Sequence, residues 1–240
     1  MLEQVLVVLL CALMGALAYW RGLLTPMGSL AAMAIGMVIG IFGGLVWVLI
    51  LLVFFLSSFA ATRYRFEAKK ALGLQEGRRG ERGATNVIAN GAVACAAAIA
   101  HPFMGSAAAI LFLVAVGAAA SDTIASELGI LSPRAYLITT FRRVAPGTNG
   151  GISLAGTLWA LFAAVYVALV GNMAFFLAGI FHPDSLSITL PVICGFMGCQ
   201  IDSLLGATLE ARGLLTKQTN NLYSVALVTL MAAVVLRCLS

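Results

Sequence analysis

Long apolar runs recur from one end of this chain to the other, and they constrain its fold more than any other feature. Of the 240 residues, 62% are hydrophobic, and the mean hydropathy is +1.05. Water-soluble domains are only about half apolar, whereas a run of roughly 17–25 apolar residues can cross a bilayer core as a helix whose backbone hydrogen bonds are satisfied internally. The sequence therefore predicts an all-α, polytopic transmembrane helical bundle.

We expect eight transmembrane spans within a single domain of residues 1–240. The apolar runs fall at residues 2–20, 27–41, 43–61, 85–101, 103–121, 153–173, 187–207 and 222–239. One long kinked helix through Gly43-Gly44 would leave seven spans instead. The first run carries Glu3 where a signal peptide has basic residues, so we interpret it as a retained span.

The basic residues predict an orientation. If the loop 62–84 faces the cytoplasm, 13 of the 14 Lys and Arg residues fall on the cytoplasmic side and only Arg237 lies outside. A seven-span chain loses this agreement at Arg21. We therefore expect cytoplasmic loops at 62–84, 130–152 and 208–221, both termini outside, and a location in the cell inner membrane. The net charge of +5 thus follows from membrane topology, and no nucleic-acid partner is expected.

Cysteine and histidine do not form a ligand set in the sequence. The five cysteines lie in apolar runs without a CxxC motif, which favours small core residues over disulfides or metal ligands. Both histidines, His101 and His182, fall at the expected outer ends of spans, away from every polar cluster. Neither is expected to be catalytic.

Two carboxylates, Asp122 and Glu127, lie at the inner end of the fifth run. Ionisable groups in a membrane helix are costly unless they face water, a metal or a cation. Their spacing separates them by about 140° on a helix, so the helix ends between them or they serve different partners. A metal site is one interpretation. The other is neutralisation by Arg142 or Arg143.

A glycine-rich turn, Pro146-Gly147-Thr148-Asn149-Gly150-Gly151-Ile152-Ser153, precedes the sixth run. Free N–H groups before a helix N-terminus suit an anion such as phosphate. Alternatively, Asn149 or Ser153 caps the helix and the glycines form a tight turn. The adjacent Arg142 and Arg143 favour phosphate, because guanidinium groups match its oxygens.

Two further motifs carry polar groups at span ends. Asp202 and Gly206, one turn apart in Asp202-Ser203-Leu204-Leu205-Gly206-Ala207-Thr208, could offer a second metal-bearing carboxylate, or the small residues could serve helix packing. Asn86 and Asn90 share a helix face, where they either orient a ligand or join neighbouring helices.

These motifs resemble, in the same order, those of the integral-membrane family that includes transmembrane protein 19 and the plant phytyl-phosphate kinase of vitamin E synthesis. The matching motifs are Val87-Ile88-Ala89-Asn90-Gly91, Ser121-Asp122-Thr123-Ile124-Ala125-Ser126-Glu127-Leu128-Gly129, Pro146 to Ser153 and Asp202 to Thr208. The resemblance implies a phytyl or prenyl monophosphate kinase that uses a nucleoside triphosphate, with CTP favoured, to make the diphosphate at the cytoplasmic leaflet of the bilayer.

The site expected from the motifs and the resemblance centres on Mg²⁺ held by Asp122, Glu127 and Asp202. The expected catalytic residues are Asp122, Glu127, Arg142, Arg143 and Asp202. The expected residues for substrate and nucleotide phosphates are Asn86, Asn90, Ser121, Gly147, Thr148, Asn149, Gly150, Gly151, Ser153, Ser203 and Thr208. Two alternatives are a lipid-phosphate cytidylyltransferase and a non-enzymatic prenyl-phosphate transporter or binding protein. Formation of a homo-oligomer is left open.

Overall fold

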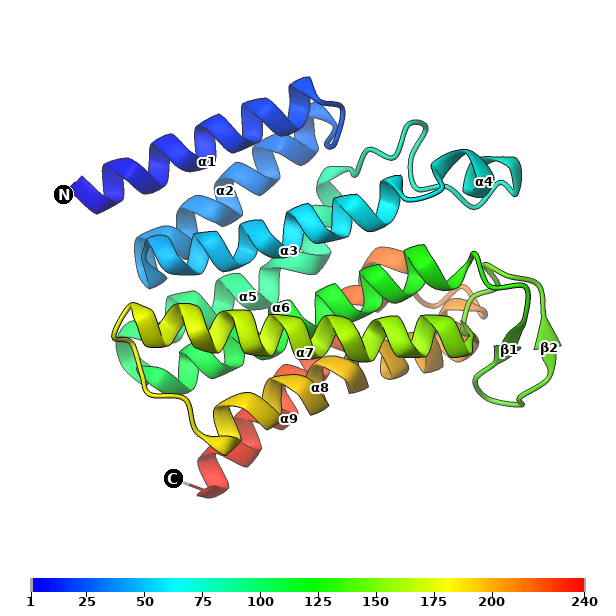
Figure 1. Cartoon of the computed structure of the whole chain (residues 1–240). Helices are drawn as coiled ribbons and strands as arrows, with labels where there is room; N and C mark the ends of the chain where they lie inside the picture. Colours follow the sequence, from blue (N-terminus) through cyan, green and yellow to red (C-terminus); the bar gives the residue numbers. More distant parts are fainter. Residues whose placement is uncertain (1, 240) are drawn as a thin grey trace.

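Eight helices long and apolar enough to cross a membrane make up the computed structural model, which describes residues 2–239 and confirms the all-α bundle. They are α1 (Leu2–Trp20), α2 (Pro26–Gly43), α3 (Leu45–Arg63), α5 (Ala84–Met104), α6 (Ser106–Gly129), α7 (Leu154–Leu177), α8 (Ser185–Leu205) and α9 (Lys217–Leu239). In Figure 1 the helices lie side by side, with both termini at one end and the longer loops at the other.

The longer loops contain short elements that the hydropathy pattern did not predict. A helix of six residues, α4 (Phe66–Ala71), lies between α3 and α5. The loop between α6 and α7 folds into a small antiparallel sheet of β1 (Ala135–Leu137), β2 (Arg143–Val144) and β3 (Gly151–Ile152), with β1 in the centre. A π-helical turn, η1 (Gly206–Glu210), continues α8. All of these elements lie at the loop end of the bundle.

The structure separates α2 from α3, so the seven-span alternative is wrong. The break falls at Gly44, which has φ +94°, a conformation that favours glycine. Glu3 from α1 accepts a hydrogen bond from the backbone N–H of Leu45 at 3.0 Å. A carboxylate is stabilised at a helix N-terminus, so Glu3 helps α3 to begin as a separate helix.

Two helices extend beyond their apolar runs at the loop end. Helix α6 continues to Gly129, past the predicted end at residue 121, and α9 begins at Lys217 rather than at residue 222. The added segments contain Asp122, Glu127 and the polar run from Lys217 to Asn221, which is why hydropathy alone excluded them. Because α6 does not end between Asp122 and Glu127, the two carboxylates must face different partners.

Helix α6 is the centre of the bundle. It packs against α3, α5, α7, α8 and α9, and 94% of its spanning window is buried, compared with 22–44% in the other seven. Small residues allow these close approaches. A Cβ placed on Gly198 of α8 would lie only 2.7 Å from the Cβ of Ala118 in α6. Four polar side chains of α6 are buried inside the bundle: Ser121, Asp122, Thr123 and Glu127.

An aromatic cluster closes the core at the end of the bundle opposite the long loops. Trp47 is fully buried, and its ring centroid lies 4.9 Å from that of His101, 4.6 Å from Phe112 and 5.2 Å from Phe175. The cluster joins α3, α5, α6 and α7, and it gives His101 a packing role.

We predict that Trp47→Ala destabilises the bundle by about 3–5 kcal/mol, the usual range for removing a buried Trp side chain. Leu49→Ala is the control, because Leu49 lies on the same helix and is 42% exposed. Thermal unfolding of the purified variants in detergent measures both. Equal unfolding temperatures for the two variants would contradict this packing.

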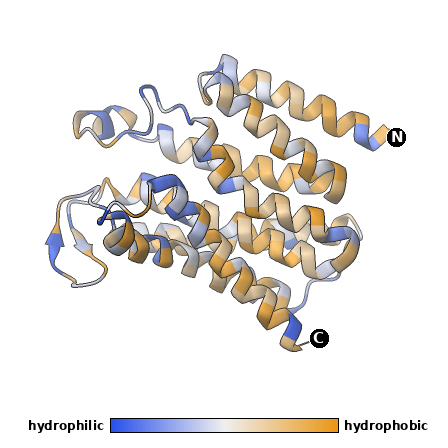
Figure 2. Cartoon of the chain, turned by 180° about the vertical axis from the view of Figure 1, so that it is seen from behind, coloured by the Kyte–Doolittle hydropathy of each residue, from blue (hydrophilic) through white to orange (hydrophobic). Residues whose placement is uncertain are grey.

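Hydrophilic residues gather at the loop end, over α4 and the β1–β2 hairpin, while the helices are mostly hydrophobic (Figure 2). The opposite end has only short links, at Gly44, Gly105 and residues 178–184. This separation matches the pattern from which the cytoplasmic orientation of the loops was predicted. The orientation itself stays a prediction.

Cysteine labelling tests the orientation. Arg78 and His182 are exposed and lie at opposite ends of the bundle. We expect a membrane-impermeant maleimide to label His182→Cys on intact cells, in a background without native cysteines, and to label Arg78→Cys only after permeabilisation. The reverse pattern would overturn the predicted orientation.

Candidate functional site

A pocket of about 310 Å³ lies at the loop end of the bundle. Its walls are the C-terminal parts of α6 and α8, the start of α9, the turn 146–153 and the segment 74–76. Among the residues predicted from sequence, the pocket brings together Asp122, Glu127, Gly147, Thr148, Asn149, Gly150, Gly151, Ser153, Asp202 and Ser203. Three distant stretches of sequence thus meet in one concave site, the usual form of a ligand pocket.

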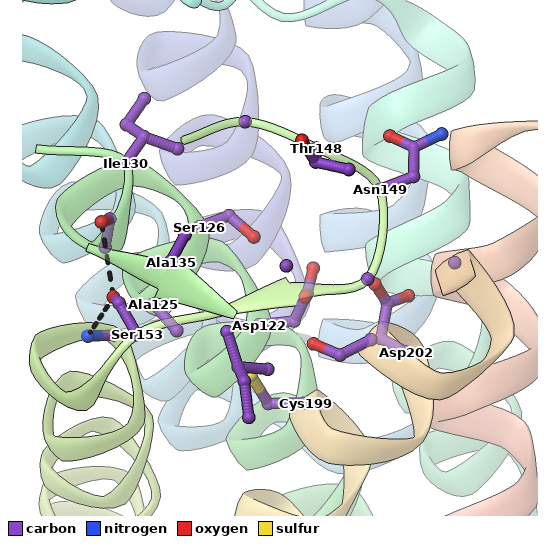
Figure 3. A pocket seen from close by; sticks show the side chains of 18 of the residues that line it. Asp122, Ala125, Ser126, Ile130, Ala135, Thr148, Asn149, Ser153, Cys199 and Asp202 are labelled. Atoms are coloured by element: carbon purple, nitrogen blue, oxygen red, sulfur yellow. Dashed lines mark hydrogen bonds between the residues drawn. The ribbon is translucent and has the colours of Figure 1, made fainter. Parts of the chain in front are cut away.

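Asp122 and Asp202 point toward each other across this pocket (Figure 3). Asp122 is only 7% exposed, and its Oδ2 accepts a hydrogen bond from the Asn221 side chain at 3.3 Å. Ser224 donates to Oδ1 of Asp202, also at 3.3 Å. Helix α9 therefore positions both carboxylates, and a cation between them would offset their mutual repulsion.

Glu127 has a different environment from Asp122, although both lie on α6. Its Oε2 forms an ion pair of 2.6 Å with Lys69, a fully buried residue of α4. Its Oε1 accepts a hydrogen bond of 2.9 Å from Thr62. Lys69 also donates to the backbone carbonyls of Ala61 and Thr62, at 2.7 and 3.1 Å. Lys69, rather than Arg142 or Arg143, thus neutralises Glu127.

The three predicted metal-binding carboxylates are not assembled into one cluster. Within residues 2–239, no group of three or more His, Cys, Asp and Glu side chains is arranged to hold a metal ion. Glu127 is engaged by Lys69, which leaves Asp122 and Asp202 as the facing pair. Two carboxylates are sufficient for Mg²⁺, which usually binds one or two of them together with substrate phosphates and water.

The glycine-rich turn covers the pocket. Gly147 and Gly150 have φ values of +82° and +74°, in the left-handed region that favours glycine. A Cβ on Gly150 would lie 2.4 Å from the Cβ of Ala207, so this position also requires the absence of a side chain. The turn therefore packs its backbone directly against η1, which follows α8.

Two polar residues of this turn have structural partners. Ser153 is the N-cap of α7: its Oγ accepts from the Gly156 N–H at 3.1 Å and donates to the Gly129 carbonyl at 3.3 Å. Asn149 does not cap the helix. Its side chain donates to Oε1 of Glu210 at 3.0 Å, which ties the turn to η1.

The π-helical turn η1 forms the part of the pocket wall next to the glycine-rich turn. Asn220 of α9 donates to the carbonyl of Asp202 at 3.0 Å and to Oε2 of Glu210 at 3.2 Å. These two bonds join α9 to residues before and within η1, so they hold this end of the helix against α9. Turns of this kind occur frequently at functional sites, and this one directs Glu210 into the pocket.

The cationic groups near the pocket are not the predicted arginines. Arg142 and Arg143 are exposed on the β1–β2 hairpin and are absent from the pocket lining. Lys217 lines the pocket and forms an ion pair of 3.0 Å with Glu76. Arg82 lies nearby and donates to Thr62 at 3.1 Å.

Arg82 is also coupled to the carboxylates of the pocket. Burial lowers the pKa of its guanidinium group, and the negative charges of Glu127, Glu76 and Asp122 oppose that shift. All three of these carboxylates line the pocket. An arginine remains cationic at neutral pH, so Arg82 contributes positive charge beside the site.

The remaining predicted residues lie outside the pocket. Ser121 donates to the Ala160 carbonyl at 3.0 Å and so joins α6 to α7. Thr208 donates to the carbonyl of Leu204 in its own helix at 2.7 Å. Asn86 and Asn90 line a separate apolar groove.

Several pocket residues were missed by sequence reasoning. They are Gln75, Glu76, Ser126, Thr157, Gln200, Glu210, Lys217, Asn220 and Asn221. One signal was available, because Lys217 to Asn221 is a polar first turn before an apolar run. Polar residues at the start of a membrane helix are ordinary interfacial residues, so the signal did not point to a site.

Comparison with known proteins shows the family to which the chain belongs. The family described as integral membrane protein DUF92 matches residues 9–233 of the chain, which includes every wall of the pocket. The chain belongs to this family. No solved structure matches this DUF92 protein significantly.

Relatives of this DUF92 protein occur in archaea, cyanobacteria and plants. An uncharacterized membrane protein of Methanocaldococcus jannaschii is 34% identical, over 81% of this chain and 78% of its own length. An uncharacterized membrane protein of Synechocystis is 31% identical over 79% of this chain and 73% of its own length. The chloroplastic protein VTE6 of Arabidopsis thaliana is 33% identical over 68% of this chain, and the match covers 49% of VTE6.

We predict that Lys69→Met destabilises the protein by about 3–5 kcal/mol, because it leaves Glu127 as an unpaired buried charge. Lys70→Met is the control, since Lys70 is the exposed neighbour on the same short helix. Adding Glu127→Gln to Lys69→Met should restore part of the loss. Unfolding curves in detergent report all three, and an unchanged curve for Lys69→Met would show that the pair is not structural.

Proposed function

We propose that this DUF92 protein is a membrane-embedded prenyl monophosphate kinase, which transfers the terminal phosphoryl group of a nucleoside triphosphate to an isoprenoid monophosphate. The observation that carries the proposal is the facing pair Asp122 and Asp202, covered by a glycine-rich turn at the loop end of a membrane bundle. The resemblance to the family of the plant phytyl-phosphate kinase supplies the acceptor class and favours CTP as the donor.

Asp122 and Asp202 fit Mg²⁺, because they are facing carboxylates from two helices with no cationic side chain hydrogen-bonded to either among the described residues. When bound, Mg²⁺ would neutralise phosphate oxygens and help to orient the donor. Asn221 and Ser224 fix the two carboxylates from α9, so the pair is held in place before any ligand arrives.

The reaction requires little acid–base chemistry from the protein. An oxygen of the acceptor phosphate forms a bond to the terminal phosphorus of the nucleotide, the bond from that phosphorus to the bridging oxygen breaks, and the nucleoside diphosphate leaves. A phosphate monoester is largely a dianion at neutral pH, with a second pKa of about 6, and is already nucleophilic. The placement of both histidines at the far end is compatible with this chemistry.

Positive charge for the transferring group is proposed to come from Lys217 and from backbone N–H groups of the turn Gly147 to Gly150. The N–H groups of Thr148 and Gly151 are excluded, because they donate to the carbonyls of Ala145 and Thr148. Lys217 is the cation on the pocket lining, and backbone N–H groups suit phosphate oxygens. We assign Glu127 a positioning role, because its pairing with Lys69 fixes α4 against α6. Arg142 and Arg143 are left outside the reaction, since both are exposed on the hairpin.

Purified protein tests the reaction directly. We expect the terminal phosphate of a radiolabelled nucleotide to appear in the diphosphate of geranylgeranyl or phytyl monophosphate. Release of pyrophosphate with a nucleotide-linked lipid would instead identify a cytidylyltransferase. Uptake of prenyl phosphate into liposomes without nucleotide would favour a transporter, and no transfer from any of the four nucleotides would overturn the proposal.

Removing the charge of one carboxylate tests whether that carboxylate is needed for the reaction or only for the fold. We predict that Asp122→Asn or Asp202→Asn lowers turnover by about 100-fold or more, because an amide holds Mg²⁺ far less well than a carboxylate. Both variants should fold, since Asn221 and Ser224 can still donate to an amide oxygen. The measurement is the initial rate of diphosphate formation.

Asp184→Asn is the matched control for these variants. Asp184 caps α8 at the opposite end of the bundle, and hydrogen bonds from Ser187 hold its pKa below the usual range, so it is ionised at neutral pH. Asparagine is an equally good N-cap, and this variant should keep normal turnover. Folded Asp122→Asn and Asp202→Asn proteins with full activity would show that both carboxylates are structural.

A further inference from the structure

A second cavity, separate from the pocket, lies among the first four spanning helices. It is a groove of about 120 Å³ between α1, α2, α3 and α5, and its walls are almost entirely apolar. Side chains from α1, α2 and α3 that form these walls include Leu10, Met14, Ala32, Met33, Leu51 and Phe55. An apolar cavity of about 150 Å³ can hold a benzene-sized guest, so this groove has room for roughly one isoprene unit.

The groove has one polar end, formed by Arg82, Asn86 and Asn90. Asn90 is 6% exposed, and its amide nitrogen donates to the Asn86 carbonyl at 2.8 Å. Its Oδ1 has no hydrogen-bond partner among the described residues. Buried polar atoms in proteins nearly always have partners, so this oxygen indicates a ligand with a hydrogen-bond donor.

Arg82 is held at this end by its backbone. Its N–H donates to the Leu23 carbonyl at 3.1 Å, and its carbonyl accepts from the Thr25 N–H at 3.0 Å. Its guanidinium group makes one side-chain hydrogen bond within residues 2–239, to Thr62. A guanidinium group has five N–H donors, so Arg82 can bind an anion while it keeps this contact.

The polar end of the groove adjoins the pocket. Thr62 lies between the two cavities, because it accepts from Arg82 and donates to Glu127, which lines the pocket. An amphipathic molecule with its chain in the groove would therefore present its head group beside the wall of the pocket. The chain would stay in an apolar environment throughout.

We propose that this groove binds the first isoprene unit of an isoprenoid monophosphate, next to the phosphate, and that Arg82 and Asn90 receive the phosphate end. The inference rests on the proposed kinase function and adds the subsite for the acceptor. Arg82 would donate to unprotonated phosphate oxygens. The free Oδ1 of Asn90 would accept from the P–OH of the singly protonated phosphate, whose pKa is about 6, and loss of this proton gives the dianion that reacts. The narrow groove suits a single branched chain better than the two chains of a phospholipid.

Binding without nucleotide tests the groove. The probe is tritiated geranylgeranyl monophosphate, added to the protein in detergent. Ala32→Trp should fill the groove and weaken binding at least tenfold. Ala34→Trp is the matched control, because Ala34 lies on the same helix and is exposed, and it should change affinity less than twofold. Equal affinities for the two variants would overturn the proposal.

The head group is tested by comparison of the monophosphate with geranylgeraniol. In the unmodified protein the monophosphate should bind more tightly, and Arg82→Gln should remove most of this preference while affinity for the alcohol stays within twofold. An unchanged preference would remove Arg82 from the subsite.

Photo-crosslinking of the unmodified protein decides the question even if a variant does not fold. A prenyl monophosphate with a benzophenone in its chain should label peptides of α1, α2, α3 and α5, and excess geranylgeranyl monophosphate should suppress the labelling. Labelling confined to other helices would overturn the groove assignment.

Two outcomes distinguish the groove proposal from the kinase proposal. Saturable binding that Ala32→Trp abolishes, without transfer from any nucleotide, would support the groove and reject the kinase. Transfer with the same KM for geranylgeranyl monophosphate in Ala32→Trp and Ala34→Trp would support the kinase and reject the groove.

Discussion

Two carboxylates on one buried helix set the arrangement of the whole loop end. Helix α6 is enclosed by five others, and a charge buried in a membrane bundle is costly unless it has a partner. Asp122 therefore takes a hydrogen bond from Asn221 of α9, and Glu127 takes an ion pair from Lys69 of α4. The positions of α4 and α9 follow from the need of these two buried carboxylates for polar partners.

The sequence predicted the spans well because the length of an apolar run reflects the thickness of the bilayer core. It also placed three motifs at one end, and the structure brings Asp122, Asp202 and the turn from Gly147 to Ser153 into one pocket. The basic residue that pairs with Glu127 could not be predicted in the same way. Lys69 lies in a charged loop where seven basic residues look alike, and only the three-dimensional fold shows which one is buried.

The bundle divides its two cavities between two sets of helices. The apolar groove belongs to α1, α2, α3 and α5, whereas α6, α8 and α9 supply helical walls of the polar pocket. Lys69, Glu127, Thr62 and Arg82 form a continuous polar chain where the two sets meet. Loss of the Thr62 hydroxyl would therefore remove a hydrogen bond from Glu127 in the pocket and another from Arg82 in the groove. This hydroxyl is a direct physical link between the two cavities.

The short links at the end opposite the loops have a consequence for membrane composition. The polar pocket is lined by residues at the loop end, and the aromatic cluster around Trp47 fills the core at the other end. A lipid that enters and leaves at the loop end stays in the leaflet from which it came. The proposed kinase would therefore change the chemistry of one leaflet only, and any transbilayer movement of its product would require a separate flippase.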